Sequence, residues 1–200
     1  PTNAYDAKGC MISAIRDNNP VMFVEHRLLY STDAPVPEDP YTVDFGKARV
    51  SGDGTDITLV GISYMLVECL AARDLLAEVG ISAEVIDPVS LMPLDVDTIA
   101  NAAQRTGKML VVDNAWTTAG ASAEIIAAVC EHDPGKPLSF GRMGYAPTTC
   151  PTTPELEKEF YPNAATIAAK AYAMVRPDEA AWAPDVEPTL PHEAAFRGPF

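Results

Sequence analysis

The residues with the clearest capacity for chemistry form the run Asp17-Asn18-Asn19-Pro20, which follows a predicted helix near the N-terminus. The last carbonyl groups of a helix carry partial negative charge, and a carboxylate and amide oxygens lie directly behind them. Such a set of oxygens is suited to a monovalent cation. The same residue types are also typical of a helix-to-strand turn, because Asn and Asp tolerate turn geometry. Composition alone favours the turn.

A second polar run, from Asp113 to Gly120, follows a predicted strand and leads into a predicted helix. Ligands of open α/β sheets bind outside the carboxyl ends of the strands, and a helix N-terminus there could hold an anion. The run lacks the spaced glycines of a dinucleotide loop and has no Lys or Arg beside it. We therefore interpret Trp116 as an interface or packing residue, with interface preferred.

No nucleophile or metal constellation is visible in the sequence. Ser63 and Ser122 begin predicted helices, but neither lies in a G-x-S-x-G elbow. A structural role for His26 is favoured over a catalytic one. The cysteines form no CxxC pair and the histidines are scattered, which argues against zinc and for reduced thiols. These residues are Cys10, Cys69, Cys130, Cys150, His26, His132 and His192.

Charge and hydropathy exclude several classes of protein. The 200 residues include 14 basic and 28 acidic side chains, a net charge of -14, which argues against nucleic acid and against anionic membranes as partners. No apolar run approaches the roughly 18 residues of a membrane span, and no signal peptide opens the sequence. We expect a cytoplasmic protein.

The elements that must position these residues follow a regular alternation from residue 55 onward. Strands are predicted at 57–62, 83–86, 109–112 and 138–142, and helices at 64–79, 94–106, 121–131 and 164–175. Ser63 is predicted to cap the first of these helices, and Gly80 and Gly107 to end two of them. The alternation predicts an α/β fold, a three-layer open sandwich with a mostly parallel sheet, over residues 55–176.

The two ends of the chain differ from this domain. Residues 1–30 predict one helix and one buried strand (20–24), which cannot enclose a core, so we expect them to complete a domain whose earlier part lies elsewhere. Residues 31–54 have linker composition. Residues 177–200 are rich in proline and acids and predict a disordered tail, although Trp182, Phe196 and Phe200 leave a docking arm as the alternative.

An ordered series of motifs identifies a family resemblance over residues 1–175. The motifs are Tyr5 to Gly9, Ala14 to Val21, Glu25-His26, Leu29-Tyr30, Gly46 to Ala48, Gly54 to Thr58, Gly80 to Asp87, Leu91 to Asp95, Trp116 and Gly120 to Ile125. Together they resemble the beta subunits of thiamine-diphosphate-dependent 2-oxo-acid dehydrogenases of the pyruvate dehydrogenase type.

The resemblance implies a two-domain subunit with a transketolase-type C-terminal domain. Residues 1–30 would then be the end of an incomplete pyrimidine-binding domain, and residues 31–54 the linker. Thiamine diphosphate and Mg²⁺ would be held in the assembled enzyme, with the diphosphate site in the alpha subunit. No catalytic or cofactor-binding residue carries over to this sequence. Gly52-Asp53-Gly54 resembles the start of the diphosphate motif, but it runs directly into a strand and is better explained as a turn.

One site does carry over from the resemblance. Related subunits hold a potassium ion through two helix carbonyl oxygens and two side chains, at positions that match Ala14, Ile15, Asp17 and Asn19. The resemblance therefore makes the cation interpretation of this run as strong as the turn.

The resemblance also implies partners: the alpha subunit, a second beta subunit and the lipoyl acyltransferase core. The expected role is subunit assembly within an enzyme that oxidatively decarboxylates a 2-oxo acid and transfers the acyl group to lipoamide, with this chain inactive alone. Residues 147–154 and 160–164 depart from the common pattern, which leaves the substrate open. The alternatives are part of a split transketolase acting on sugars and a non-catalytic interaction domain.

Overall fold

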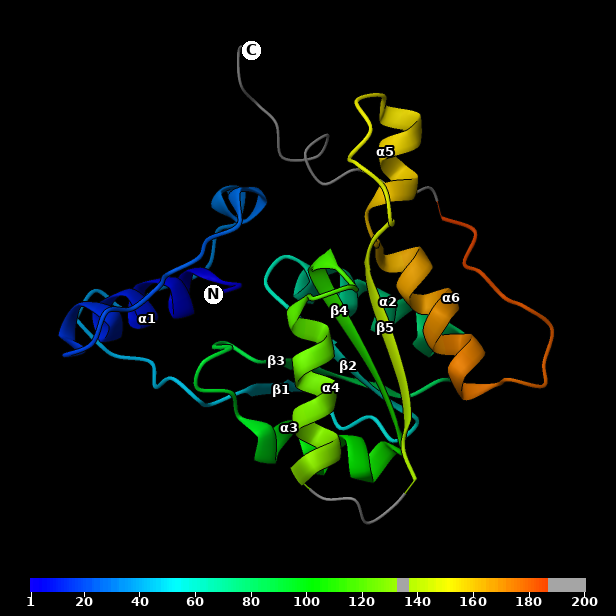
Figure 1. The fold of residues 1–200 in the computed structure, drawn as a ribbon, viewed down its shortest axis with the longest axis horizontal. Helices are drawn as coiled ribbons and strands as arrows, with labels where there is room; N and C mark the ends of the chain where they lie inside the picture. Colours follow the sequence, from blue (N-terminus) through cyan, green and yellow to red (C-terminus); the bar gives the residue numbers. More distant parts are fainter. Residues whose placement is uncertain (133–136, 187–200) are drawn as a thin grey trace.

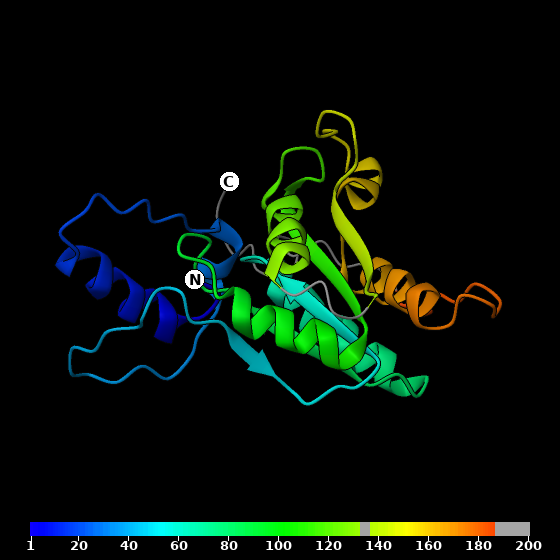
Figure 2. The same ribbon diagram turned by 60° about the horizontal axis from the view of Figure 1, so that its bottom comes forward.

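A five-stranded sheet between two layers of helices forms the body of the protein in the computed structural model, which describes residues 1–132 and 137–186 (Figures 1 and 2). The strand order is β1-β3-β2-β4-β5. The strands are β1 (Arg49–Ser51), β2 (Ile57–Gly61), β3 (Ala83–Asp87), β4 (Lys108–Trp116) and β5 (Ser139–Tyr145). Only β1 is antiparallel to its neighbour, so the predicted mostly parallel α/β sandwich is confirmed.

Both faces of the sheet are covered by helices. Packed on one face are α2 (Met65–Glu78) and α6 (Ala164–Val175), and on the other α3 (Val96–Thr106) and α4 (Ala121–His132). Strand β2 is buried at all five positions, with Leu59 in the α2–α6 core and Val60 in the α3–α4 core. This double coverage explains why its sequence is a continuous apolar run rather than an alternating one.

The crossovers depend on close backbone approach. Gly61 ends β2 where α2 begins, and a Cβ atom at this position would lie only 2.6 Å from Leu66 Cα. Gly107 ends α3 in the left-handed region with a φ of 72°, as the sequence predicted, and its N–H donates to the Ala103 carbonyl. The two glycines are therefore required for different reasons, space at Gly61 and backbone conformation at Gly107.

The N-terminal segment is anchored to this body through α1 (Ala4–Arg16), which Asn3 caps by accepting the Asp6 N–H. The buried Asp6 carboxylate accepts hydrogen bonds from Arg49 on β1, including one of 2.9 Å from Nε. Burying a carboxylate is costly unless it is paired, so this ion pair fixes the helix against the edge of the sheet.

The predicted buried strand at 20–24 is wrong. These residues form no strand, and Met22 and Val24 are 90% and 70% exposed. A strand is stable only when a neighbour pairs with its backbone and one face is covered, and no strand of the described residues lies beside this segment. A short 3-10 helix, η1 (Arg27–Ser31), follows it.

Three further predictions need correction. Ser63 does not cap α2, because it adopts a φ of 54° in a tight turn and Tyr64 precedes the helix without a side-chain cap. Helix α5 (Pro154–Phe160) was not predicted. Within the expected tail, Trp182 packs on the ring of Tyr172. Residues 187–200 lie outside the described residues, as do Phe196 and Phe200.

No helix among residues 1–132 and 137–186 is both long enough and apolar enough to cross a membrane.

Gly61→Ala should lower the free energy of unfolding by about 2–3 kcal/mol, because the added methyl group meets the backbone of α2. Gly107→Ala is the matched control, because nothing lies within 4 Å of its added Cβ. This variant should lower the free energy of unfolding by only about 1 kcal/mol, the cost of placing alanine in the left-handed conformation. Urea titration of both variants measures the difference. Equal destabilisation would contradict the steric role of Gly61.

Candidate functional site

The carboxyl ends of the parallel strands form the edge at which an open α/β sheet binds ligands. The chain passes from β2 to β3 on one side and later to β4 on the other, so the topological switch point lies between β2 and β4. Three non-glycine residues with positive φ lie at this edge, one after each of these strands: Ser63, Val89 and Ala119. Such conformations cost free energy and gather at functional edges.

The first residues of the chain, His26 and the linker at Gly46 lie against this edge. Thr2 Oγ1 donates a hydrogen bond to the Asp87 carboxylate at the end of β3. The Gly46 N–H donates to Ser90 Oγ at 2.7 Å, in the loop after β3. The imidazole of His26 stacks on Tyr64 with ring centroids 5.2 Å apart. The edge that would be open to a ligand is thus partly occupied by the chain itself.

His26, Tyr64 and Glu68 form a continuous polar line from the N-terminal segment into the α2–α6 layer. Tyr64 Oη donates to Glu68 Oε1 at 3.0 Å, and the Ala164 N–H at the start of α6 donates to Glu68 Oε2 at 2.7 Å. Burial lowers the pKa of His26, whose buried Nδ1 has no hydrogen-bond partner among the residues that the structure describes. Burial raises the pKa of the Glu68 carboxyl and of the Tyr64 hydroxyl. The line connects elements rather than activating a nucleophile, in agreement with a structural role for His26.

The polar run from Asp113 to Gly120, whose first four residues belong to β4, caps a helix. The Asp113 carboxylate accepts the Ser122 N–H at 3.2 Å, and burial raises the pKa of this carboxyl. Because the Asp113 carboxylate already lies at the N-terminal end of α4, it would repel an anionic ligand there, which disfavours the anion alternative for this run. The Asn114 amide reaches the Ile62 carbonyl across the switch point at 3.5 Å.

Trp116 is held in one orientation by the loop after β5. Its indole N–H donates to the Ala146 and Thr148 carbonyls at 3.0 and 3.3 Å, and its ring makes an edge contact with Tyr145. The side chain remains 49% exposed, so it combines packing with an accessible ring face. Tyr145 also contacts Phe160 and Tyr161. Sequence reasoning missed this aromatic cluster, because its members lie on separate elements.

The four predicted cation ligands lie together at the end of α1. The Asp17 N–H donates to the Ser13 carbonyl, and Asp17 Oδ1 accepts the backbone N–H and the side-chain amide of Asn19 at 2.8 and 3.0 Å. These hydrogen bonds, the backbone one first, lower the pKa of Asp17. The geometry is that of an Asx turn at a solvent-exposed helix end, with the carboxylate held beside the last turn of α1.

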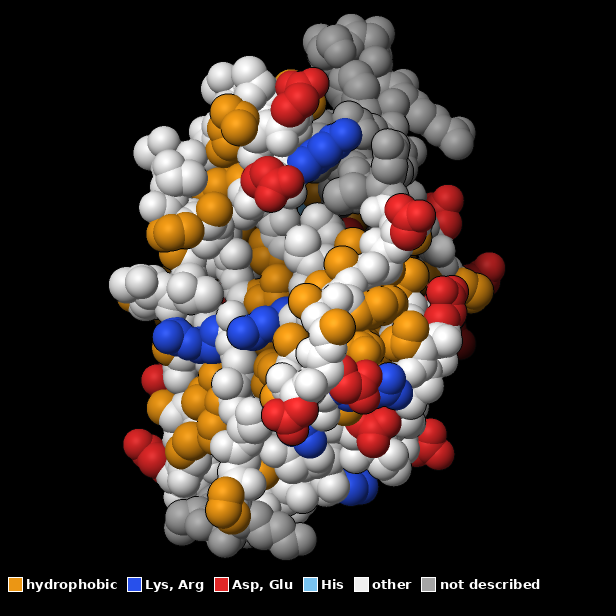
Figure 3. Space-filling view, turned by 90° about the vertical axis from the view of Figure 1, so that its right-hand side faces the viewer, with side chains coloured by type: hydrophobic (Ala, Val, Ile, Leu, Met, Phe, Trp, Pro, Cys, Tyr) orange, Lys and Arg blue, Asp and Glu red, His pale blue; other side chains and the backbone are white. Residues whose placement is uncertain are grey.

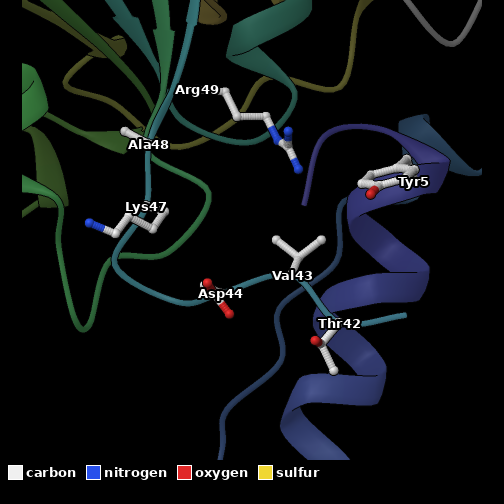
Figure 4. A pocket seen from close by; sticks show the side chains of 7 residues that line it. All are labelled: Tyr5, Thr42, Val43, Asp44, Lys47, Ala48 and Arg49. Atoms are coloured by element: carbon white, nitrogen blue, oxygen red, sulfur yellow. The ribbon is translucent and has the colours of Figure 1, made fainter. Parts of the chain in front are cut away.

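Other candidate sites do not assemble. No group of three or more His, Cys, Asp or Glu side chains within the described ranges could hold a metal. Gly54 packs on the backbone of β3, so the Gly52-Asp53-Gly54 run is a turn between β1 and β2, as expected. A shallow pocket of about 240 Å³ lies beside α1, but Lys47 and Arg49 on its wall point in opposite directions (Figure 4). Arg49 is already paired with Asp6.

Comparison with known proteins places this architecture in a family. The model of the family described as "Transketolase, C-terminal domain" matches residues 46–167, more than half of the chain. The chain belongs to this family. Among curated relatives, a subunit beta of acetoin:2,6-dichlorophenolindophenol oxidoreductase from Cupriavidus necator is 40% identical over 172 residues. A pyruvate dehydrogenase E1 component subunit beta from Bacillus subtilis is 47% identical over 130 residues. The predicted resemblance to such beta subunits is confirmed.

The shared length sets the scope of these comparisons. The alignments cover 86% and 64% of this chain but only 51% and 40% of the two relatives, so the chain spans about half of their length. A solved split-gene transketolase, described as an inactive beta4 tetramer, superposes with a TM-score of 0.60 at 24% identity, covering 74% of this chain and 52% of that one. This likeness supports the transketolase-type fold.

Glu68→Gln should change how stability depends on pH. The folded-state pKa of Glu68 is raised, so folding favours the protonated carboxyl, and the associated stabilisation is lost as pH rises through the folded pKa. Glutamine has the same shape and does not titrate. We therefore expect the difference in unfolding free energy, variant minus unmodified protein, to increase between about pH 4 and about pH 8. Denaturant titrations across this range measure the difference, and a constant offset would refute the role of burial.

Proposed function

We propose that this chain is the carboxyl-terminal portion of the beta subunit of a thiamine-diphosphate-dependent 2-oxo-acid dehydrogenase and serves subunit assembly. The observation that carries the proposal is the 40% identity to a beta subunit over 86% of the chain, a longer stretch than residues 46–167 that the family model matches. The enzyme would oxidatively decarboxylate a 2-oxo acid and transfer the acyl group to lipoamide. A sugar transketolase and a non-catalytic domain are less supported, because the relatives are named as dehydrogenase and acetoin oxidoreductase subunits.

The cofactor of such an enzyme does not fit the residues of this chain. Thiamine diphosphate supplies a carbanion-stabilising centre, and its diphosphate needs Mg²⁺ and oxygen ligands. Among the described residues the buried acids of the strand edge are already committed: Asp113 caps α4, Asp87 binds Thr2, and Glu68 joins α2 to α6. We therefore propose that thiamine diphosphate and Mg²⁺ bind elsewhere in the assembled enzyme, with the diphosphate in the alpha subunit.

The contribution of this chain would be to present surfaces for assembly. Half of the exposed large hydrophobic side chains of the described residues lie in the first 30 positions: Tyr5, Met11, Ile15, Val21, Met22, Val24 and Tyr30. Such a concentration marks a surface that is covered in the functional state. We propose that the half of the relatives' length not spanned here covers it, pairing with the segment at 20–24 to complete the pyrimidine-binding domain.

The remaining partners are the alpha subunit, a second beta subunit and the lipoyl acyltransferase core, in the cytoplasm. The second beta subunit would dock beside Trp116, whose half-exposed indole is held rigidly by two backbone carbonyls. A large ring fixed in advance loses little conformational freedom on binding, which is typical of interface anchors.

Residues 1–200 alone should not bind thiamine diphosphate measurably and should have no decarboxylase activity, because neither half of the cofactor site is present. Isothermal titration calorimetry with thiamine diphosphate and Mg²⁺ tests the binding. Addition of the alpha subunit and of the half of the beta subunit not spanned here should restore both properties. Micromolar binding to this chain alone would contradict the proposed division of roles.

The end of α1 is the proposed potassium site of the assembled enzyme. The donors present fit K⁺ in kind: the carbonyl oxygens of Ala14 and Ile15, the Asp17 carboxylate and the Asn19 amide oxygen are all hard oxygen ligands. The Asx turn supports this by placing the carboxylate beside the helix end, with the Asn19 nitrogen turned toward Asp17 and its amide oxygen therefore turned away.

Asp17→Ala should abolish a potassium-dependent stabilisation of the intact heterotetramer, because Asp17 supplies the only negative charge among the four ligands. Melting curves in potassium chloride and in a large organic cation should separate for the unmodified complex and coincide for the variant. Asp17→Asn is the matched control, since it keeps an acceptor for the Asx turn but removes the charge, and it should also lose the preference for potassium. If the unmodified complex shows no preference, the residues form only a turn.

A further inference from the structure

The chain does not leave the domain at the end of α6. The Arg176 N–H donates to the Tyr172 carbonyl and ends the helix, and Arg176 Nη2 then donates to the Val79 carbonyl at the end of α2 at 2.9 Å. Its guanidinium also lies over the Tyr172 ring, 5.4 Å from the centroid. One side chain therefore connects the last turns of both helices on this face of the sheet.

The residues that follow return to the same place. Glu179 Oε2 accepts the Tyr172 hydroxyl at 2.8 Å and pairs with Arg176 at 3.4 Å. Three residues later the indole of Trp182 packs on Tyr172, with ring centroids 5.1 Å apart. Trp182 is half-buried against the α2–α6 core. Tyr172 is thus held at its ring by an arginine and a tryptophan and at its hydroxyl by a glutamate.

We propose that residues 177–186 are a strap that binds in cis and seals the α2–α6 face. This inference goes beyond the proposed function, which assigns no role to the segment. The sequence left two alternatives for Trp182, an unstructured position or an anchor for a partner; its contact with Tyr172 assigns the anchor to this chain's own domain. The strap follows the family match, which ends at residue 167 within α6.

The strap has a consequence for assembly. Apolar side chains gather between charged ones on the side of the molecule that carries α6 and the strap (Figure 3). While Trp182 occupies its place, the core residues below it, including Tyr172 at 8% exposure, are closed to a partner. Partner subunits would then dock on other faces, and release of the strap would expose the Tyr172 ring and the apolar residues beneath it.

Hydrogen exchange of the full chain tests the strap. Trp182→Ala should raise exchange rates about tenfold at the C-terminal turns of α6 and α2, where the strap closes the contacts, and leave α3 and α4 unchanged. Trp182→Phe should restore most of the protection, because a phenyl ring can still stack on Tyr172. Trp116→Ala is the matched control, since this tryptophan lies at the opposite end of β4 from the strap's contacts and should not alter exchange in α6.

A chain that ends at Arg176 provides the second measurement. It should bind a hydrophobic dye and associate in light scattering, because the α2–α6 face is uncovered, while the full chain should do neither through this face. Unchanged exchange in Trp182→Ala would overturn the proposal, and so would equal acceleration in all helices, which indicates global destabilisation. A truncated chain that matches the full chain in dye binding and mass would also overturn it. None of these results depends on thiamine diphosphate or on decarboxylase activity.

Discussion

The requirement that a parallel sheet be covered on both faces determines most of this structure. Strands β2 and β4 lie in the middle of the sheet, and neither can face water without exposing a row of Val, Leu and Ile side chains. The helices that connect the strands supply this cover, which places every connection at one of the two strand ends. Loops of chemical interest therefore gather at the carboxyl ends, where Ser63, Val89 and Ala119 adopt their unusual backbone conformations.

At that edge, buried carboxyl groups join separate elements. Burial raises the pKa of Glu68, Asp87 and Asp113, yet each carboxylate accepts hydrogen bonds from a different part of the chain. A buried acid with such partners holds two elements in register, because separating them would leave the charge unsolvated. This use of acids agrees with a domain that positions subunits, whereas a catalytic edge would leave at least one such group facing a reactant.

Sequence patterns correctly predicted two kinds of element: those that depend on neighbouring residues in the sequence, and strands that are covered by other parts of this chain. The apolar run at 57–62 and the glycine stop at Gly107 are examples, because length, composition and backbone freedom identify them without tertiary information. The run at 20–24 has a similarly apolar composition but is an exposed segment. A strand needs a neighbouring strand and a layer that covers it, and no described element supplies either one to this run. Composition cannot distinguish the two cases.

Less of the candidate functional site could be predicted from the sequence, because most of its contacts are also non-local. The four residues at the end of α1 are close in sequence, so their proximity was assured. The stacking of His26 on Tyr64 and the ring cluster around Tyr145 join residues that are 15 to 38 positions apart, and no periodicity records such contacts. The acidic, proline-rich stretch after α6 predicted disorder from its average composition, whereas the outcome at Trp182 depended on one ring meeting another.

The two edges of the sheet are unequal, which limits how copies of this fold could join through their backbones. Strand β1 is only three residues long, runs antiparallel to β3 and carries Arg49, so it offers little backbone to an added strand. Strand β5, with seven residues, is the only long edge among the described strands. A sheet that can grow on one side alone can form a closed pair but cannot propagate a fibre, because the second copy presents no new long edge. Aggregation by strand addition is thereby limited by topology, independently of the charge of the surface.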